Sequence, residues 1–237
     1  MKVVARKMAE KEVSFLHGDL ANALRRHPST LLLFVQLLEV VLYPATGNTE
    51  FGRALLSLAG ALVLLTALRL ISYIAPRVWH AAILAGLAVA FNLAWLEFGW
   101  ESLKSWQAGL ESLFYFYAAY ALIRYILRDN RPTKDELVAA AATFTLLVWA
   151  FTNLLVLCQL LQPSAFLGAG EAGDPRSWSE LMFLSFALFT NTGIGTVVPL
   201  TAASRAIGDL EMFTGVMYLA LVVSRLVGQA AAQGVKD

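Results

Sequence analysis

The residues with the clearest chemical potential in this sequence form a glycine-containing segment near its carboxyl-terminal end. The segment consists of Thr190, Asn191, Thr192, Gly193, Ile194, Gly195 and Thr196. Glycine adopts backbone angles that other residues avoid, so a Gly-x-Gly segment can turn successive carbonyl oxygens toward one side. A ring of such oxygens can replace the water shell of a cation. The pattern therefore predicts an ion-binding site made of main-chain carbonyls.

The apolar stretches on either side of this segment differ in length. Residues 177–190 are too few to cross a bilayer, which takes about 20 residues, whereas residues 206–228 are long enough. Irregular backbone at membrane depth must be buried in protein or line a water-filled path. The order of short helix, glycine segment and spanning helix therefore predicts a segment that re-enters the membrane and lines a pore.

The short stretch has a defined helix start. Ser177 and Glu180 have the spacing of a capping box, which satisfies two free backbone N–H groups at the beginning of a helix. A helix from 177 to 190 would direct its carboxyl end, with its negative partial charge, toward the glycine segment. A plainer interpretation is a capped extracellular helix followed by a tight glycine turn. The spanning stretch that follows favours the pore.

Residues from Ser177 to Gly228 resemble the pore module of the tetrameric potassium-channel superfamily, in the six-transmembrane, one-pore-loop form found in bacteria. The family's Thr-Val-Gly-Tyr-Gly-Asp motif falls on residues 191–196. The downstream pair Val198-Pro199 and the run from Met217 to Gly228 also look like those of bacterial members.

This resemblance implies an architecture and a ligand. It implies a pore helix at 177–190, a filter at 191–196 and an inner helix at 206–228, assembled as a homotetramer. It implies K⁺ as the permeant ligand, with no other cofactor, and ion-binding residues Thr190, Asn191, Thr192, Gly193, Ile194 and Gly195. The carbonyl oxygens implied as K⁺ ligands are those of Asn191, Thr192, Gly193 and Ile194.

Four positions of the filter segment depart from the family pattern. Asn191 stands in place of threonine, Thr192 of valine, Ile194 of tyrosine and Thr196 of aspartate. In the family, the tyrosine and the aspartate brace the filter through hydrogen bonds to aromatic residues of the pore helix. Without these groups we expect apolar packing to hold the filter, and strict potassium selectivity is left open.

Five positions are expected to support the pore or its gate. Ser177 and Glu180 hold the pore helix, and Thr196 ends the filter. Glu211 resembles an acid of the inner helix in bacterial relatives, and we expect it to support the back of the filter. Gly215 has the position of a gating hinge, although a glycine there also permits close packing against a neighbouring helix.

The composition is that of a membrane protein. Hydrophobic residues make up 58% of the 237 residues and the mean hydropathy is +0.64, whereas soluble domains contain about 45–50% apolar residues. We therefore expect an all-α membrane protein with a tetrameric ion-channel fold, built from six transmembrane helices plus a re-entrant pore helix and filter. The expected spans are residues 29–43, 54–74, 80–98, 109–128, 136–161 and 206–228.

The first expected span is short and contains Glu39. An ionisable residue inside a membrane marks a functional site by default, so Glu39 could bind an ion or pair with Arg53 or Lys104. The short helix also brings Glu39 within reach of the lipid headgroups. Both interpretations stay open, as does whether this stretch crosses the bilayer completely.

The positions of lysine and arginine predict the orientation. With six spans and both termini in the cytoplasm, all but four of the 18 basic residues lie on the inner side, as the positive-inside rule requires. We therefore expect a multi-pass protein of the plasma (inner) membrane. The basic residues left on the outer side are Arg53, Lys104, Arg176 and Arg205.

A polar, proline-containing break at about residue 132 divides the chain. Residues 1–28 are expected to form a cytoplasmic or interfacial N-terminal segment, and residues 29–131 a four-helix, voltage-sensor-like domain. Residues 132–237 are expected to form the pore domain, in which 136–161 is the outer helix.

The sensor-like domain lacks the residues that sense voltage. A sensor needs repeated arginines, because one charge moved through 100 mV yields only about 2.3 kcal/mol. The fourth span contains only Arg124 and Arg128, both near its cytoplasmic end. We therefore expect weak voltage sensing or none.

Other functional classes find no support in the sequence. The metalloprotease, nucleophile-elbow and paired-aspartate patterns of enzymes are absent. Cys158 is the one cysteine and the three histidines are scattered, so neither a disulfide framework nor a metal cluster is expected. A net charge of +1 offers no nucleic-acid surface.

The expected function is a potassium-conducting cation channel whose partners are copies of the same chain and the lipid bilayer. The alternative is a non-conducting or regulatory pore-like membrane subunit, since the filter has lost several usual side chains.

Overall fold

The computed structural model describes residues 28–46, 50–74, 78–98, 101–128, 134–168, 174–225, 227–228 and 231. Almost all of the expected N-terminal segment, residues 1–27, therefore lies outside the described residues, as does the centre of the break near residue 132.

The described chain is mostly helical, which confirms the predicted helical class. The N-terminal half contains α2 (Pro28–Thr46), α3 (Glu50–Ile74), α4 (Trp79–Phe98) and α5 (Glu101–Ile126). The C-terminal half contains α6 (Lys134–Leu161), α7 (Trp178–Phe189) and α8 (Ala202–Tyr218), which continues into a π-helical segment, Leu219–Val223.

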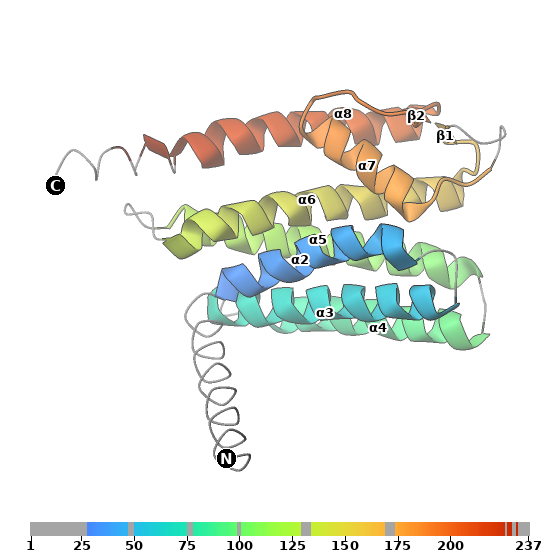
Figure 1. Cartoon of the computed structure of the whole chain (residues 1–237), viewed down its shortest axis with the longest axis horizontal. Coiled ribbons are helices and arrows are strands. Elements are labelled where there is room, and N and C mark those ends of the chain that lie inside the picture. The colour runs from blue at the N-terminus through green and yellow to red at the C-terminus, as the bar shows by residue number, and fades with distance from the viewer. Residues whose placement is uncertain are drawn as a thin grey trace, which may run out of the picture.

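Helix α6 lies between the two halves of the structure (Figure 1). It contacts α2 and α5 on one side and α7 and α8 on the other. Helices α3 and α4 pack against α2 and α5, farther from α8. The long helices lie side by side, and α7 crosses obliquely next to α6 and α8 (Figure 1). The position of α7 relative to the rest of the chain is therefore determined mainly by α6 and α8.

Small side chains allow α6 to approach its neighbours closely. Ala142 and Ala150 are fully buried on α6, and small residues at helix contacts let backbones come together. Ser112 of α5 donates to the Ala150 carbonyl at 2.9 Å, and Gln36 of α2 donates to the Ala142 carbonyl at 3.4 Å. These polar contacts satisfy buried groups while they connect the four-helix half to α6.

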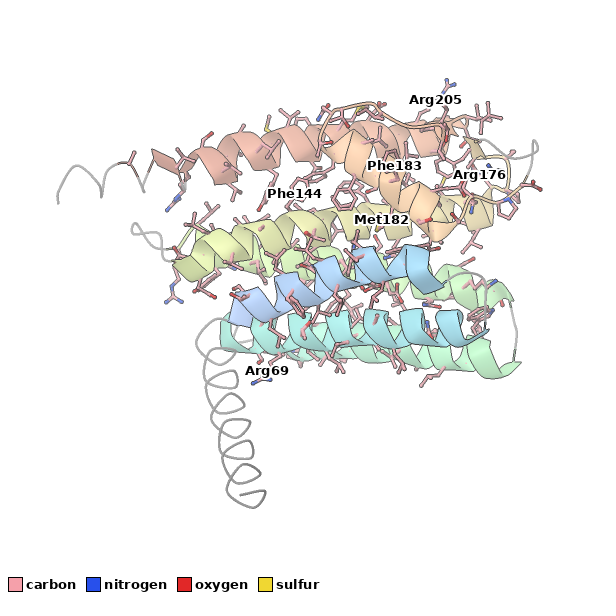
Figure 2. All side chains as sticks on the ribbon, viewed as in Figure 1. Arg69, Phe144, Arg176, Met182, Phe183 and Arg205 are labelled. Carbon is pink, nitrogen blue, oxygen red and sulfur yellow. The ribbon has the colours of Figure 1, made fainter. Side chains whose placement is uncertain are left out.

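Aromatic residues fill the space between α6, α7 and α8. The Phe144 ring lies 5.0 Å from the Phe189 ring, edge to face, and 6.3 Å from the Tyr218 ring. Figure 2 shows Phe144 on α6, facing these helices. The Tyr218 hydroxyl also donates to the Ala140 carbonyl at 2.5 Å, so α8 is attached to α6 by both packing and a hydrogen bond.

Two helices of the described chain are long and apolar enough to cross a membrane, by length and composition. They are Asp135–Leu161 and Ala202–Val223. The other expected spans are helical, but their apolar cores within the described residues are shorter, such as Ser29–Tyr43 and Trp79–Trp95. The structure thus agrees with membrane association, and the six-span layout stays a prediction.

Several helix boundaries differ from expectation, and two of them have a clear physical reason. Helix α5 begins at Glu101 rather than at residue 109. A hydropathy pattern sees only the apolar centre of a helix, and α5 extends through polar turns in which Gln107 donates to Glu111 at 2.9 Å. Helix α8 begins at Ala202 rather than at 206, because Thr201 and Ser204 form a reciprocal cap.

A two-stranded antiparallel sheet, with two residues in each strand, lies at one end of the C-terminal half. Strand β1 (Phe166–Leu167), after α6, pairs with β2 (Val198–Pro199), which precedes α8. Ala165 extends this junction, since its carbonyl accepts from the Leu200 N–H at 2.8 Å and from the Ser204 hydroxyl at 3.0 Å. The sequence pattern did not predict these strands; two residues are too few to show a period.

Candidate functional site

The start of α7 has the capping box that the sequence predicted. The Ser177 hydroxyl accepts from the Glu180 N–H at 3.3 Å, and Glu180 Oε2 accepts from the Ser177 N–H at 2.8 Å. The bond from the Ser177 N–H, and after it the one that the Ser177 hydroxyl donates to Glu180 Oε2 at 2.8 Å, lower the pKa of Glu180. Gln159 of α6 exchanges two hydrogen bonds with the Arg176 backbone, at 2.7 and 2.9 Å. The beginning of α7 is therefore attached to the end of α6.

The other end of α7 lies about midway along α8. The Asn191 side chain donates to the Met212 carbonyl at 3.3 Å, and Gly215 contacts Phe189. At 1.5 Å per residue these positions lie roughly 15–20 Å from Ala202, about half the ~30 Å thickness of a bilayer core. The chain then returns to the β1–β2 end where α7 began (Figure 1). The chain therefore runs along α8 to about its middle and back; that this path re-enters a membrane stays a prediction.

Helix α7 ends in a Schellman motif. The Asn191 N–H donates to the Leu188 carbonyl and the Thr192 N–H to the Ala187 carbonyl, both at 3.0 Å. In this motif the residue after the cap adopts a left-handed conformation, usually as glycine and sometimes as asparagine. Asn191 has a φ of 55°. The asparagine in place of the family's threonine therefore has a local structural role, which its position after a capped helix could have indicated.

The sign of φ alternates along the glycine segment. It is positive at Asn191 (55°), Gly193 (66°) and Gly195 (150°), and negative at Thr192, Ile194 and Thr196. At its start, a right-handed Thr190 is followed by Asn191 with a positive φ, an order that aligns successive N–H groups on one side.

The hydrogen bonds of the segment agree with that alignment. The Thr192 and Gly193 N–H groups both donate to the Ala187 carbonyl, at 3.0 and 3.3 Å. Among the described residues, no donor bonds to a carbonyl oxygen of residues 191–196. All seven residues from 190 to 196 are exposed in the single chain. Their carbonyl oxygens are therefore available to a ligand.

The polar side chains of the segment bond to nearby helices. The Thr190 hydroxyl donates to the Phe186 carbonyl at 2.7 Å and lies 3.2 Å from the Thr192 hydroxyl. The Thr192 hydroxyl donates weakly to Ala187 at 3.4 Å. These contacts supply the partner that a threonine in the usual valine position needs.

A cavity of about 310 Å³ separates α7 from the end of the segment. Glu180, Phe183 and Thr196 are among its lining residues, so two expected support residues, Glu180 and Thr196, do meet here. A Cβ on Gly195 would lie 3.5 Å from the Phe183 ring, so this ring lies next to the backbone of the segment; apolar packing in place of the missing hydrogen bonds stays a prediction. Ile194 points away and is 65% exposed.

Glu211 lies behind the segment, between α6, α7 and α8. It is fully buried. Its Oε1 makes a short hydrogen bond with the hydroxyl of Ser185 on α7, which is also 2.8 Å from the Val148 carbonyl of α6. The support role of Glu211 stays a prediction, and its partner, Ser185, was not identified from the sequence. A serine inside an apolar helix was the available signal.

Gly215 is a close-packing position. A Cβ there would lie 1.9 Å from the Phe189 carbonyl oxygen. The residues that α8 buries recur at helical spacing, namely Ser204, Gly208, Glu211, Gly215 and Tyr218. The gating hinge stays a prediction from position alone, while the alternative of close packing is what the structure shows. The irregular turn of this helix lies farther on, at Leu219–Val223.

Glu39 lies outside this site. It is 7% exposed on α2 and has a carboxylate oxygen 3.9 Å from the position a Cβ would take on Gly60. Among the described residues, Glu111 of α5 is the acid that interacts electrostatically with the Glu39 carboxyl group. Lys104, one of its expected partners, lies over the Trp95 ring at 4.6 Å, and the side chain of Arg53 lies outside the described residues.

Comparisons of this chain with protein-family models, with curated proteins and with solved structures return no match. The site therefore has to be interpreted from its own geometry.

Replacing Gly215 with alanine should destabilise the protein by about 1–3 kcal/mol or more, the cost of overpacking a tight contact. Thermal unfolding in detergent measures this. Gly86→Ala is the matched control, since a Cβ there meets nothing within 4 Å and removing a helical glycine gains up to about 1 kcal/mol. Equal melting temperatures for both variants would contradict the close approach of α8 to α7.

Glu180→Gln should make the protein less sensitive to acid. Because the pKa of Glu180 is lower in the folded chain than its ordinary 4.5, its ionised form stabilises the fold above pH 4.5, and this contribution is lost as the pH falls below that value. Wild type should therefore be more stable than Glu180→Gln at neutral pH, with the difference closing in acid. A difference that stays constant from neutral to acid pH would show that the capping carboxylate does not act through its charge.

Proposed function

We propose that this chain is a subunit of a tetrameric cation channel, with residues 190–196 as the filter. The observation that carries the proposal is the segment's backbone. Its φ values alternate in sign and its carbonyl oxygens accept no hydrogen bond within the described chain. A cation could replace its water shell with such oxygens, and potassium is the ion that the resemblance implies.

The electrostatics of α7 support a cation. The carboxyl end of a helix carries about half a negative charge, and α7 ends at the segment, at the depth of a bilayer centre. Several such ends converging on one axis would favour a positive ion there. The capping box at the opposite end places Glu180 near the positive pole of the helix, where a carboxylate stabilises the helix.

One chain supplies only one strand of carbonyls, so a cage around a bare cation needs several copies. Helix α8 presents an apolar outer face to pack against them or against lipid: Leu210, Phe213 and Leu221 are each at least 60% exposed. Four copies related by a central axis would place the exposed segment 190–196 along that axis. The proposed assembly is therefore a homotetramer in a bilayer.

The proposed topology has six spans with both termini in the cytoplasm. Helices α6 and α8 have the length and apolarity for it, and α3 and α5, with 25 and 26 residues, are long enough to cross when tilted. Figure 2 shows Arg176 and Arg205 toward one end of the structure and Arg69 toward the other. This separation agrees with the outer and inner sides that the charge pattern predicts.

Voltage sensing should be weak. Helix α5 occupies the place of a sensor helix, yet its basic residues are Lys104 near the start and Arg124 in the last turn. The Arg124 guanidinium lies 5.9 Å from the Tyr120 ring, an arrangement suited to a helix end. Too few charges are present along α5 to draw much energy from the membrane potential.

A non-conducting pore-like subunit is the second candidate. The observation that favours it is the Schellman motif, which accounts for Asn191 without any ion. The same geometry would then serve only to hold α7 against α8.

Purified protein in liposomes separates the two candidates. We expect a particle of tetramer mass in mild detergent and cation flux down a K⁺ gradient, with little dependence on voltage. Gly193→Ala should reduce the flux without dissociating the tetramer, because a Cβ there meets nothing within 4 Å but the φ of 66° is strained for alanine.

Gly86→Ala is again the matched control and should conduct normally. A stable monomer, or a tetramer that passes no cations into or out of the liposomes, would contradict the proposal of a channel. Flux that is unchanged in Gly193→Ala would show that residues 190–196 are not the filter.

A further inference from the structure

The buried contact between α6, α7 and α8 contains one hydrogen for two acceptors. Ser185 Oγ lies 2.8 Å from the Val148 carbonyl and makes a short contact with Glu211 Oε1. A serine hydroxyl has one hydrogen to donate, and an ionised carboxylate can only accept. If Glu211 were ionised, one of these two contacts would have no hydrogen between its oxygen atoms.

A single added proton satisfies both contacts. Ser185 then donates to Val148, and the Glu211 carboxyl group donates to Ser185. We propose that Glu211 is a neutral carboxylic acid and acts through Ser185 as the positioning residue that ties α7 and α8 to α6 behind the glycine segment.

The rival arrangement has an ionised Glu211 that accepts the Ser185 hydrogen. The Val148 carbonyl would not be left alone, since it also accepts from the Thr152 hydroxyl at 2.8 Å. The carboxylate, however, would be fully buried with one hydrogen bond, and its Oε2 has no partner within the described residues. A buried charge without a partner costs several kcal/mol, so the neutral acid is the better arrangement.

The charged and titratable groups of the surrounding helices lie elsewhere along α6, α7 and α8 and do not contact Glu211 in the described chain. On α7, Glu180 belongs to the capping box. On α6, Asp135 accepts from Ser29 at 3.0 Å in the first turn, beside Glu136, and Cys158 is buried in a separate apolar cluster. On α8, Arg205 donates to the Pro199 carbonyl, Asp209 is exposed and Tyr218 bonds to Ala140. None of these groups pairs with Glu211 in the described chain.

This inference deepens the proposed function and depends on it only for the effect on conduction. Since Ser185 lies on the helix that carries the filter, loss of the proton would leave an unpaired buried charge next to that helix. We expect the protein to lose stability and flux together in alkaline buffer. Protonation itself can be measured whether or not the protein conducts.

Infrared spectroscopy of the full-length protein tests the protonation directly. The difference spectrum of wild type minus Glu211→Gln at neutral pH should contain the carbonyl stretch of a protonated carboxylic acid, displaced in heavy water. The difference for Glu180→Gln is the matched control and should contain carboxylate bands. Carboxylate bands alone in the Glu211→Gln difference would overturn the proposal. If that variant does not fold, Ser185→Ala replaces it, because losing the acceptor should move the acid band.

Stability measurements test the positioning role. Glu211→Gln keeps a neutral donor and acceptor, so its melting temperature should stay near that of wild type and should no longer fall in alkaline buffer. Glu211→Ala and Ser185→Ala should both lower it clearly. If Glu211→Gln were as damaging as Glu211→Ala, the neutral arrangement would be wrong. If the infrared band of the protonated acid is present but the protein passes no cations, the channel proposal is wrong and the proposal that Glu211 is protonated still holds.

Discussion

The position along α8 at which α7 ends is the constraint on which the rest of the C-terminal half depends. The Phe189 carbonyl approaches α8 so closely that only glycine fits at position 215. This contact stops α7 about midway along α8, and the Asn191 amide adds a bond to Met212 one turn away. The chain must then return to the end where α7 began, because β2 is paired with β1 there. The path of the chain along α8 and back follows from these attachments rather than from the glycine segment itself.

Hydrogen-bond accounting connects this path to the proposed chemistry. Buried N–H and C=O groups need partners, and the N–H groups of Thr192 and Gly193 find theirs at the end of α7. The carbonyl groups of residues 191–196 have no donor in the described chain. In a water-filled path this imbalance would be tolerated, and around a cation it would be useful. The same imbalance would be costly in lipid.

Helix α6 holds the two halves together and also shapes the back of the site. Its carbonyl groups at Ala142, Val148 and Ala150 each accept from a side chain of a different helix, α2, α7 and α5. Such bonds are available because small residues bring the helix backbones near one another. The four-helix half therefore supports the C-terminal half through α6, although its own buried acid, Glu39, lies away from the glycine segment.

The sequence by itself determined the helical class, the capped start of α7 and the position of the glycine segment, because capping and glycine conformations depend on neighbours within a few residues. It could not predict the β1–β2 pair, the Ser185–Glu211 contact, or which face of α8 is buried. Tyr218, for example, is buried and packs against Phe144. These features join residues far apart in the chain, and no local pattern encodes such distances. Only the tertiary structure decided them, since close helix packing depends on both partners at once.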